Sequence, residues 1–249
     1  MVDSSQPEQD TAPIDTLESF AFACHPGVAC YTECCRLLEL AISPYDALRL
    51  RQATSLPSQQ LLEKYFIIEQ DPGEAFPRVY LTMVDDGRAS CVFVTKAGCS
   101  VYEHRPGACR TYPLGRAVSR IAGGVNERFV ILRENHCQGF LETAQQTPRN
   151  YITDQGLTRY NTFNDAVMEI LQHEAIRNGF IPSRSDVELF ILALYNIDSF
   201  REHLFHNRLH FTVMSHNERQ QLEDDESLLR FGIDMLHKQI FSQFIGNIS

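Results

Sequence analysis

Eight cysteines are the residues of this sequence best suited to chemistry, and none of them lies beyond residue 137. A thiolate can act as a nucleophile, pair in a disulfide or bind a soft metal. The first residues, MVDSSQPEQD, lack the basic and apolar regions of a signal peptide, so we expect a cytoplasmic protein with reduced thiols. Clustered reduced cysteines favour metal binding over disulfides or catalysis. The candidate ligands are Cys24, Cys30, Cys34, Cys35, Cys91, Cys99, Cys109 and Cys137.

The first cluster of cysteines runs from Cys24 to Cys35. Cys30 and Cys34 are four residues apart, and on a helix this spacing would place both thiols on one face. Cys35 would be rotated from Cys34 by about 100° on such a helix. Cys35 therefore either joins the same centre through an irregular backbone, or faces a second centre or the core.

The second cluster combines cysteines with glycines and arginines. Gly98 precedes Cys99, and Gly107 lies near Cys109. A metal-binding loop needs such close backbone approach and free N–H donors to sulfur. Four thiolates around Zn²⁺ or a [4Fe–4S]²⁺ core leave a net charge of about −2. Nearby cations are therefore candidate compensating charges, namely Arg36, Arg105 and Arg110.

The stretch Cys99-Ser100-Val101-Tyr102 through Arg105-Pro106-x-x-Cys109-Arg110-x-Tyr112-Pro113 resembles the CxxCxxCC family of zinc- or iron-chelating domains, the YkgJ-type cysteine cluster proteins. Members pair this stretch with an upstream Phe-x-Cys…Cys-Cys segment and a later lone cysteine. Here Phe22-Ala23-Cys24…Cys34-Cys35 and Cys137 are similar, so the resemblance covers about residues 20–140. The upstream spacing Cys24-x5-Cys30-x3-Cys34-Cys35 departs from the family's Cys-x-x-Cys-x-x-Cys-Cys, mainly at Cys30. Some relatives, the flagellin lysine N-methylases, fuse this domain to a helical part.

The cysteine count favours an iron–sulfur cluster of the [4Fe–4S] type. Eight cysteines exceed what one tetrahedral zinc ion can use, and regular Cys-x-x-Cys pairs are too few for two zinc ribbons. A cluster also accepts ligands from distant, irregular loops. Zinc and mononuclear iron are the alternatives, and His104 or His136 could replace a thiolate. The strongest ligand candidates are Cys24, Cys34, Cys99 and Cys109.

Three functions are consistent with such a site. The first is a metal-binding protein in which an iron–sulfur cluster, or zinc, organises the N-terminal part. The second is a cluster-dependent transferase, with protein lysine methylation as the nearest analogy, and the third is metal sequestration or delivery. The sequence leaves open whether the protein is an enzyme and whether it has a protein substrate or partner. The net charge of −10 disfavours nucleic acid, and no apolar run is long enough to cross a membrane.

Short helices and hairpins must position these cysteines. One helix is expected from about Cys30 through Leu40, a second begins after Ser43-Pro44, and a third covers residues 59–68. Beyond Pro148 the pattern is helical. Two capping-box spacings mark helix starts there, Ser185-x-x-Glu188 and Ser215-x-x-Glu218.

Two β-hairpins are expected between these helical segments. The first pairs residues 79–84 with 90–94, and the second pairs 117–122 with 126–133 around Gly123-Gly124. The fold class is therefore α+β, with a cysteine-rich metal-binding portion of small antiparallel β-hairpins followed by a helical C-terminal portion. The expected organisation is a disordered tail, a cysteine-cluster metal-binding domain and a helical C-terminal region, at residues 1–18, 19–148 and 149–249.

Overall fold

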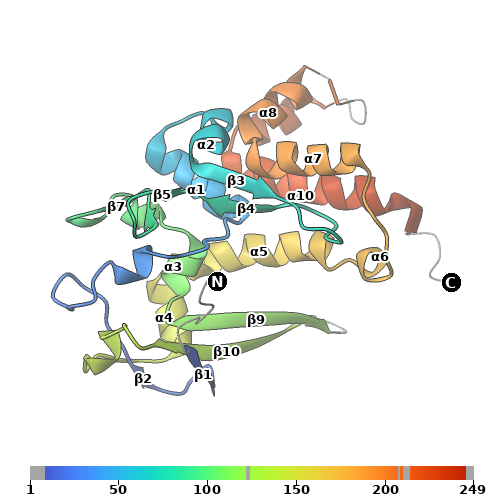
Figure 1. The fold of residues 1–249 in the computed structure, drawn as a ribbon. Coiled ribbons are helices and arrows are strands. Elements are labelled where there is room, and N and C mark those ends of the chain that lie inside the picture. Colours follow the sequence, from blue (N-terminus) through green and yellow to red (C-terminus); the bar gives the residue numbers. More distant parts are fainter. Residues whose placement is uncertain (1–8, 122–123, 207, 210–213, 245–249) are drawn as a thin grey trace. The chain divides into compact units, whose positions relative to one another are not determined.

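The computed structural model describes residues 9–121, 124–206, 208–209 and 214–244. Short antiparallel strand pairs precede a helical C-terminal region, which confirms the α+β class (Figure 1). The chain forms two compact units. Unit 1 comprises Met1–Leu38 and Met83–Arg159, and unit 2 comprises Glu39–Thr82 and Tyr160–Ser249. The predicted domain boundary between residues 148 and 149 stays a prediction. The two compact units divide the chain at other positions, after Leu38, Thr82 and Arg159.

The main sheet of unit 1 has three antiparallel strands in the order β1-β10-β9. β9 (Leu114–Ile121) and β10 (Gly124–Glu134) form the predicted second hairpin (Figure 1), and Gly123 of its expected turn lies outside the described residues. β1 (Gln9–Ile14) falls within the predicted tail, yet it pairs with β10. Ile14 lies opposite Phe129 and is buried, so long-range pairing orders a segment whose composition alone indicated a tail.

Two-stranded pairs and short helices make up the rest of unit 1. The strand pairs are β2 (Phe20–Ala21) with β11 (Gln145–Gln146), β5 (Met83–Val84) with β6 (Ser90–Cys91), and β7 (Val94–Thr95) with β8 (Gly98–Cys99). The helices are η1 (Glu33–Cys35), η2 (Tyr102–His104), α3 (Gly107–Thr111), η3 (Gly139–Leu141) and α4 (Pro148–Asp154). The prediction of one helix from Cys30 to Leu40 is wrong, because Thr32 (φ 71°) and Leu37 (φ 52°) adopt left-handed backbone conformations.

An aromatic cluster forms the core of unit 1. Phe22 lies near the rings of Phe140 (5.2 Å between centroids), Tyr112 (6.1 Å) and Tyr151 (6.4 Å). Cys137 packs against this cluster. The core thus supports the chain segments that carry the first and last cysteines.

Unit 2 consists of helices and one two-stranded sheet. Its elements are α1 (Pro44–Thr54), α2 (Ser58–Tyr65), β3 (Phe66–Glu69), β4 (Arg78–Leu81), most of α5 (Leu157–Leu171), α6 (Glu174–Arg177), α7 (Arg184–Tyr195), α8 (Ile197–Phe205), α9 (His216–Gln221), α10 (Asp225–Phe241) and η4 (Ser242–Phe244). The predicted third helix ends at Tyr65, because the chain continues as β3 and pairs with β4. β4 therefore does not belong to the first predicted hairpin, of which only the β5–β6 pair forms.

Side-chain caps define several helix starts in unit 2. Ser43 caps α1 through a capping box with Asp46, and Ser215 caps α9 in the same way, as the sequence predicts. The predicted capping box at Ser185 and Glu188 is wrong. The box lies two residues earlier, where Ser183 and Asp186 form it. Among the described residues, no helix has both the length and the apolar character needed to cross a membrane.

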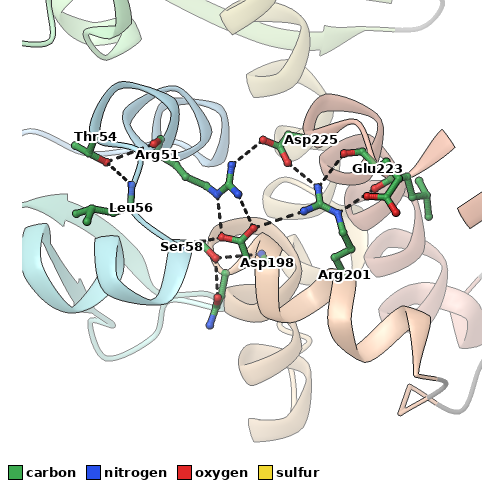
Figure 2. A network of polar contacts seen from close by, with 10 residues as sticks. Arg51, Thr54, Leu56, Ser58, Asp198, Arg201, Glu223 and Asp225 are labelled. Carbon is green, nitrogen blue, oxygen red and sulfur yellow. Dashed lines mark hydrogen bonds and ion pairs between the residues drawn. The ribbon is translucent and has the colours of Figure 1, made fainter. Parts of the chain in front are cut away.

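A network of charges ties three helices of unit 2 together (Figure 2). Arg51 of α1 donates to Asp198 of α8 through Nε (2.9 Å) and to Asp225 of α10 (2.8 Å). Arg201 donates to Asp225 (2.6 Å), and the backbone N–H of Ser58 donates to Asp198 (2.8 Å). Each carboxylate thus has several donors, which favours one arrangement of these helices.

Candidate metal centre

All eight cysteines lie in unit 1, and none of them forms a disulfide. Backbone hydrogen bonds between distant segments place seven of them in two neighbouring groups. The exposed cysteines are Cys24, Cys34 and Cys109, and the half-buried ones are Cys30, Cys35, Cys91, Cys99 and Cys137.

The first group, which we name the Cys137 group, comprises Cys24, Cys30 and Cys137. The N–H of Ala23 donates to the carbonyl of Gly139 over 3.1 Å, which aligns the chain at Cys24 with the segment after Cys137. The N–H of Gln138 donates to Sγ of Cys30 over 3.1 Å. A backbone N–H that donates to sulfur is a contact typical of thiolate sites in metalloproteins.

Gly139 makes this close approach possible. A Cβ atom at this position would lie 2.6 Å from the ring of Phe22 and 2.8 Å from the carbonyl oxygen of Ala23. Every other residue type would therefore push the two segments apart. The sequence analysis missed Gly139, although its position two residues after the last cysteine was an available signal.

The second group, which we name the Cys91 group, comprises Cys34, Cys35, Cys91 and Cys99. An antiparallel bridge joins Arg36 to Ser90, and this register places Cys35 opposite Cys91. The β7–β8 turn then brings Cys99 back beside Val94. The neighbouring Cys35 thiol, together with burial, raises the pKa of Cys34 far above its ordinary value.

The chain between Cys30 and Cys34 is a series of tight turns. The N–H of Tyr31 donates to Val28 O and the N–H of Glu33 donates to Cys30 O, and Thr32 has φ 71°. The prediction that Cys30 and Cys34 share one face of a helix is therefore wrong. The irregular backbone instead distributes them between the two groups.

Electrostatic interactions show that the two groups adjoin. Burial, then the thiols of Cys34, Cys30 and Cys137, raise the pKa of Cys24 to about 11. Burial also raises the pKa of Cys91, and the nearby Cys99 and Cys34 add to this effect. Several ionised thiols in such proximity repel one another, so a cation among them would stabilise the thiolate forms.

Of the three arginines predicted to compensate charge, Arg105 acts on the thiols. It lowers the pKa of Cys24 and Cys99 against the effect of burial. Its guanidinium stacks on the ring of Tyr102 at 3.8 Å. Arg36 donates to Ser90 Oγ (2.9 Å) and supports the β-bridge.

Arg110 forms hydrogen bonds with the backbone around Arg105-Pro106. Its guanidinium donates to the carbonyls of Arg105 (3.1 Å), Gln155 (2.8 Å) and Glu103. Cys109 lies in α3, and its role as a ligand stays a prediction. His136 forms a contact with the Glu134 carboxylate at 3.7 Å.

Two tyrosines next to the thiols were not anticipated from the sequence. Tyr31 packs so tightly on the β7–β8 turn that a Cβ at Gly98, which has φ +116°, would lie 2.5 Å from its hydroxyl oxygen. Burial, followed by the neighbouring thiol of Cys137, raises the pKa of Tyr112 far above its ordinary value. Tyr112 belongs to the stretch that carries the family resemblance, but neither tyrosine was predicted to lie beside the thiols, because tyrosine is common in cores.

The donor set fits a soft metal. Thiolates are the preferred ligands of zinc and of iron–sulfur clusters, and seven thiols lie in two adjoining groups with Arg105 beside them. As the side chains lie, no three Cys, His, Asp or Glu residues in the described part of the chain are placed to hold a metal ion. Binding would therefore need rotation of the cysteine side chains, since zinc–sulfur bonds are about 2.3 Å long.

Comparison with known proteins supports the metal-binding assignment. Residues 23–138 match the model of the CxxCxxCC family, whose description is “putative zinc- or iron-chelating domain”. The match contains all eight cysteines. Comparison with curated proteins and with solved structures finds no significant match. The likeness to flagellin lysine N-methylases thus receives no support.

Proposed function

We propose that the protein holds iron as a [4Fe–4S] cluster through the cysteines of unit 1, because residues 23–138 match the model of the zinc- or iron-chelating CxxCxxCC family. The observation that carries the proposal is the gathering of seven thiols from irregular segments far apart in the sequence. A cluster accepts ligands from irregular, distant segments, whereas structural zinc sites take most of theirs from regularly spaced Cys-x-x-Cys pairs. In the reducing cytoplasm, the location that the sequence predicts, these thiols stay available for metal.

Each part of unit 1 has a role in this proposal. The cysteines bind the metal, and Arg105 offsets part of the negative charge of the thiolates. The core around Phe22 supports the segments that carry Cys24 and Cys137. Bound there, an iron–sulfur cluster supplies one-electron redox chemistry. No nucleic-acid partner is proposed, since the net charge is −10.

Metal analysis of anaerobically purified protein tests the proposal. We expect iron and acid-labile sulfide in equal amounts, near four of each per chain, together with a broad visible absorption band that fades on reduction. Protein reconstituted after full metal removal is the control for loss during purification. Stoichiometric zinc without iron or sulfide would contradict the cluster and favour a zinc site instead.

A further inference from the structure

Strand β3 of unit 2 has one edge that no strand among the described residues covers. Its partner β4 is covered on both sides, because the N–H of Leu81 donates to the carbonyl of Leu40 (2.9 Å) and the N–H of Ile42 donates to that of Val79 (2.8 Å). Val79 therefore directs its backbone groups away from β3. By the alternation of an antiparallel pair, Ile68, which lies opposite Val79, directs its N–H and C=O away from β4. Such an open edge is a template for a further strand.

An apolar groove lies beside this open edge. It has a volume of about 410 Å³ and lies between α2, β3 and α7. Four apolar side chains line it: Leu62, Ile68, Ile191 and Leu192. Ile68 is 45% exposed, and Ile67, on the opposite face of the strand, is 44% exposed. A strand added at this edge would place every second side chain over the groove.

Carboxylates line the polar part of the groove. Glu63 and Glu188 are among its lining residues. Glu63 accepts a hydrogen bond from Nε2 of Gln59 (2.6 Å), and this donor is neutral. Glu188 pairs with Arg184 (2.8 Å), whose side chain is almost fully exposed, so solvent screens this pair. The rim of the groove is therefore acidic.

The open strand ends in another acidic residue, Glu69. The cations nearby in the chain have other partners. Arg78, opposite Glu69 in the strand pair, forms its ion pair with Glu74, and Lys64 lies over the ring of Tyr65 at 5.0 Å. This acidic surface, in a chain of net charge −10, attracts a basic partner and repels a second copy of itself.

We propose that the β3 edge and this groove bind an extended segment of another protein in which apolar residues alternate with basic ones. The segment pairs with the outward backbone groups of Ile68 and places its apolar side chains against Leu62 and Ile191. Its basic side chains, on the other face, lie beside Glu69. The backbone edge thus selects an extended chain, and the groove and the carboxylates select its side chains. This surface belongs to unit 2 and is separate from the metal-binding function proposed for unit 1.

Binding of a labelled model peptide to the full chain tests the proposal. The probe is acetyl-Lys-Val-Lys-Val-Lys-Val-Lys-amide, and fluorescence anisotropy measures its affinity. We expect saturable binding that weakens at least about fivefold between about 50 mM and about 500 mM salt. The same peptide with glutamate in place of lysine should bind at least about tenfold more weakly. A peptide with N-methylated valines, which cannot pair as a strand, should also lose affinity. Equal binding of the three peptides would overturn the proposal.

Two isoleucines of the same strand provide matched variants. We expect Ile68→Ser to weaken binding about tenfold, since it removes an apolar side chain from the groove. Ile67→Ser, with nearly the same exposure on the opposite face, should change the affinity less than about twofold. Both side chains are exposed, so both variants should fold, which circular dichroism checks. Equal losses of affinity in the two variants would show that the groove does not bind the peptide.

Sedimentation tests the alternative occupant, a second copy of the chain. We expect the unchanged protein to show no dimer that depends on the β3 edge, because its carboxylates would face one another. A dimer that dissociates on Ile68→Ser, without any peptide binding, would assign the edge to a second copy and overturn the proposal. Neither result changes the metal content of the protein, so the proposed function is tested independently.

Discussion

At the scale of single residues, the property that most affects this site is the charge beside the thiols. Arg105 is close enough to Cys24 and Cys99 to lower the pKa of both thiols. It is held there by stacking on Tyr102 and by donating to the side chain of Gln155. A planar, permanently charged guanidinium fits both contacts better than a lysine would. Its charge therefore stabilises thiolates in the place where a metal needs them.

We expect Arg105→Gln to weaken metal retention. Loss of one positive charge near the surface costs about 1 kcal/mol, which is roughly a fivefold decrease in apparent affinity. Competition against a chelator measures it. The control is Arg149→Gln, which removes an exposed arginine from the same unit and should leave affinity unchanged. Equal retention by both variants would show that Arg105 does not compensate the thiolates.

At the scale of elements, short segments in close contact position the cysteines, rather than long helices. η3 begins at Gly139, directly against the segment that leads to Cys24. There is no free space at this contact, because a Cβ would meet both a backbone oxygen and an aromatic ring. The arrangement of the Cys137 group thus depends on one glycine.

We expect Gly139→Ala to destabilise unit 1 by about 2 kcal/mol, within the usual cost of overpacking a core. It should also reduce the metal held by the Cys137 group, since it separates Cys24 from Cys137. Urea unfolding and metal analysis measure the two effects. Leu141→Ala is the control from the same short helix. Leu141 is 79% exposed, so its substitution should change stability by less than about 0.5 kcal/mol. Equal stability of the two variants would refute the tight contact.

At the scale of the whole molecule, the two units are stabilised by different means. In unit 1 the chain uses antiparallel strand pairs and an aromatic core against which Cys137 packs. Unit 2 has long helices joined by the Arg51 network (Figure 2). Burial opposes ionisation of Asp198, but donors from Arg51 and Ser58 outweigh it and hold its pKa below the ordinary value. Asp198 therefore stabilises the folded state only while it is ionised.

The sign of the pH dependence follows from this lowered pKa. The stabilisation is present above the pKa of Asp in the unfolded chain, about 3.9, and is lost as the pH falls through the lower folded value. We expect Asp198→Asn to lose about 2 kcal/mol at pH 7 and to show a weaker fall in stability on acidification. Urea unfolding between pH 7 and pH 3 measures both. Asp234→Asn, at an exposed pair with Arg230, is the control and should follow the unchanged protein.

The sequence by itself determined the chemistry and the local elements. The cysteine count and the Arg-Pro stretch around Cys109 predicted a zinc- or iron-chelating domain, and residues 23–138 match that family. The caps at Ser43 and Ser215 and the β9–β10 hairpin were predicted as well. These features depend on residues a few positions apart, so a local pattern can encode them.

Only the tertiary structure decided how the thiols are divided and which segments hold them. The bridge between Arg36 and Ser90 and the contact of Ala23 with Gly139 join residues far apart in the sequence, which no local pattern encodes. The same holds for β1, whose pairing with β10 orders residues of tail-like composition. Spacing along a supposed helix misassigned Cys30 and Cys34, because the backbone there follows long-range contacts rather than helical periodicity.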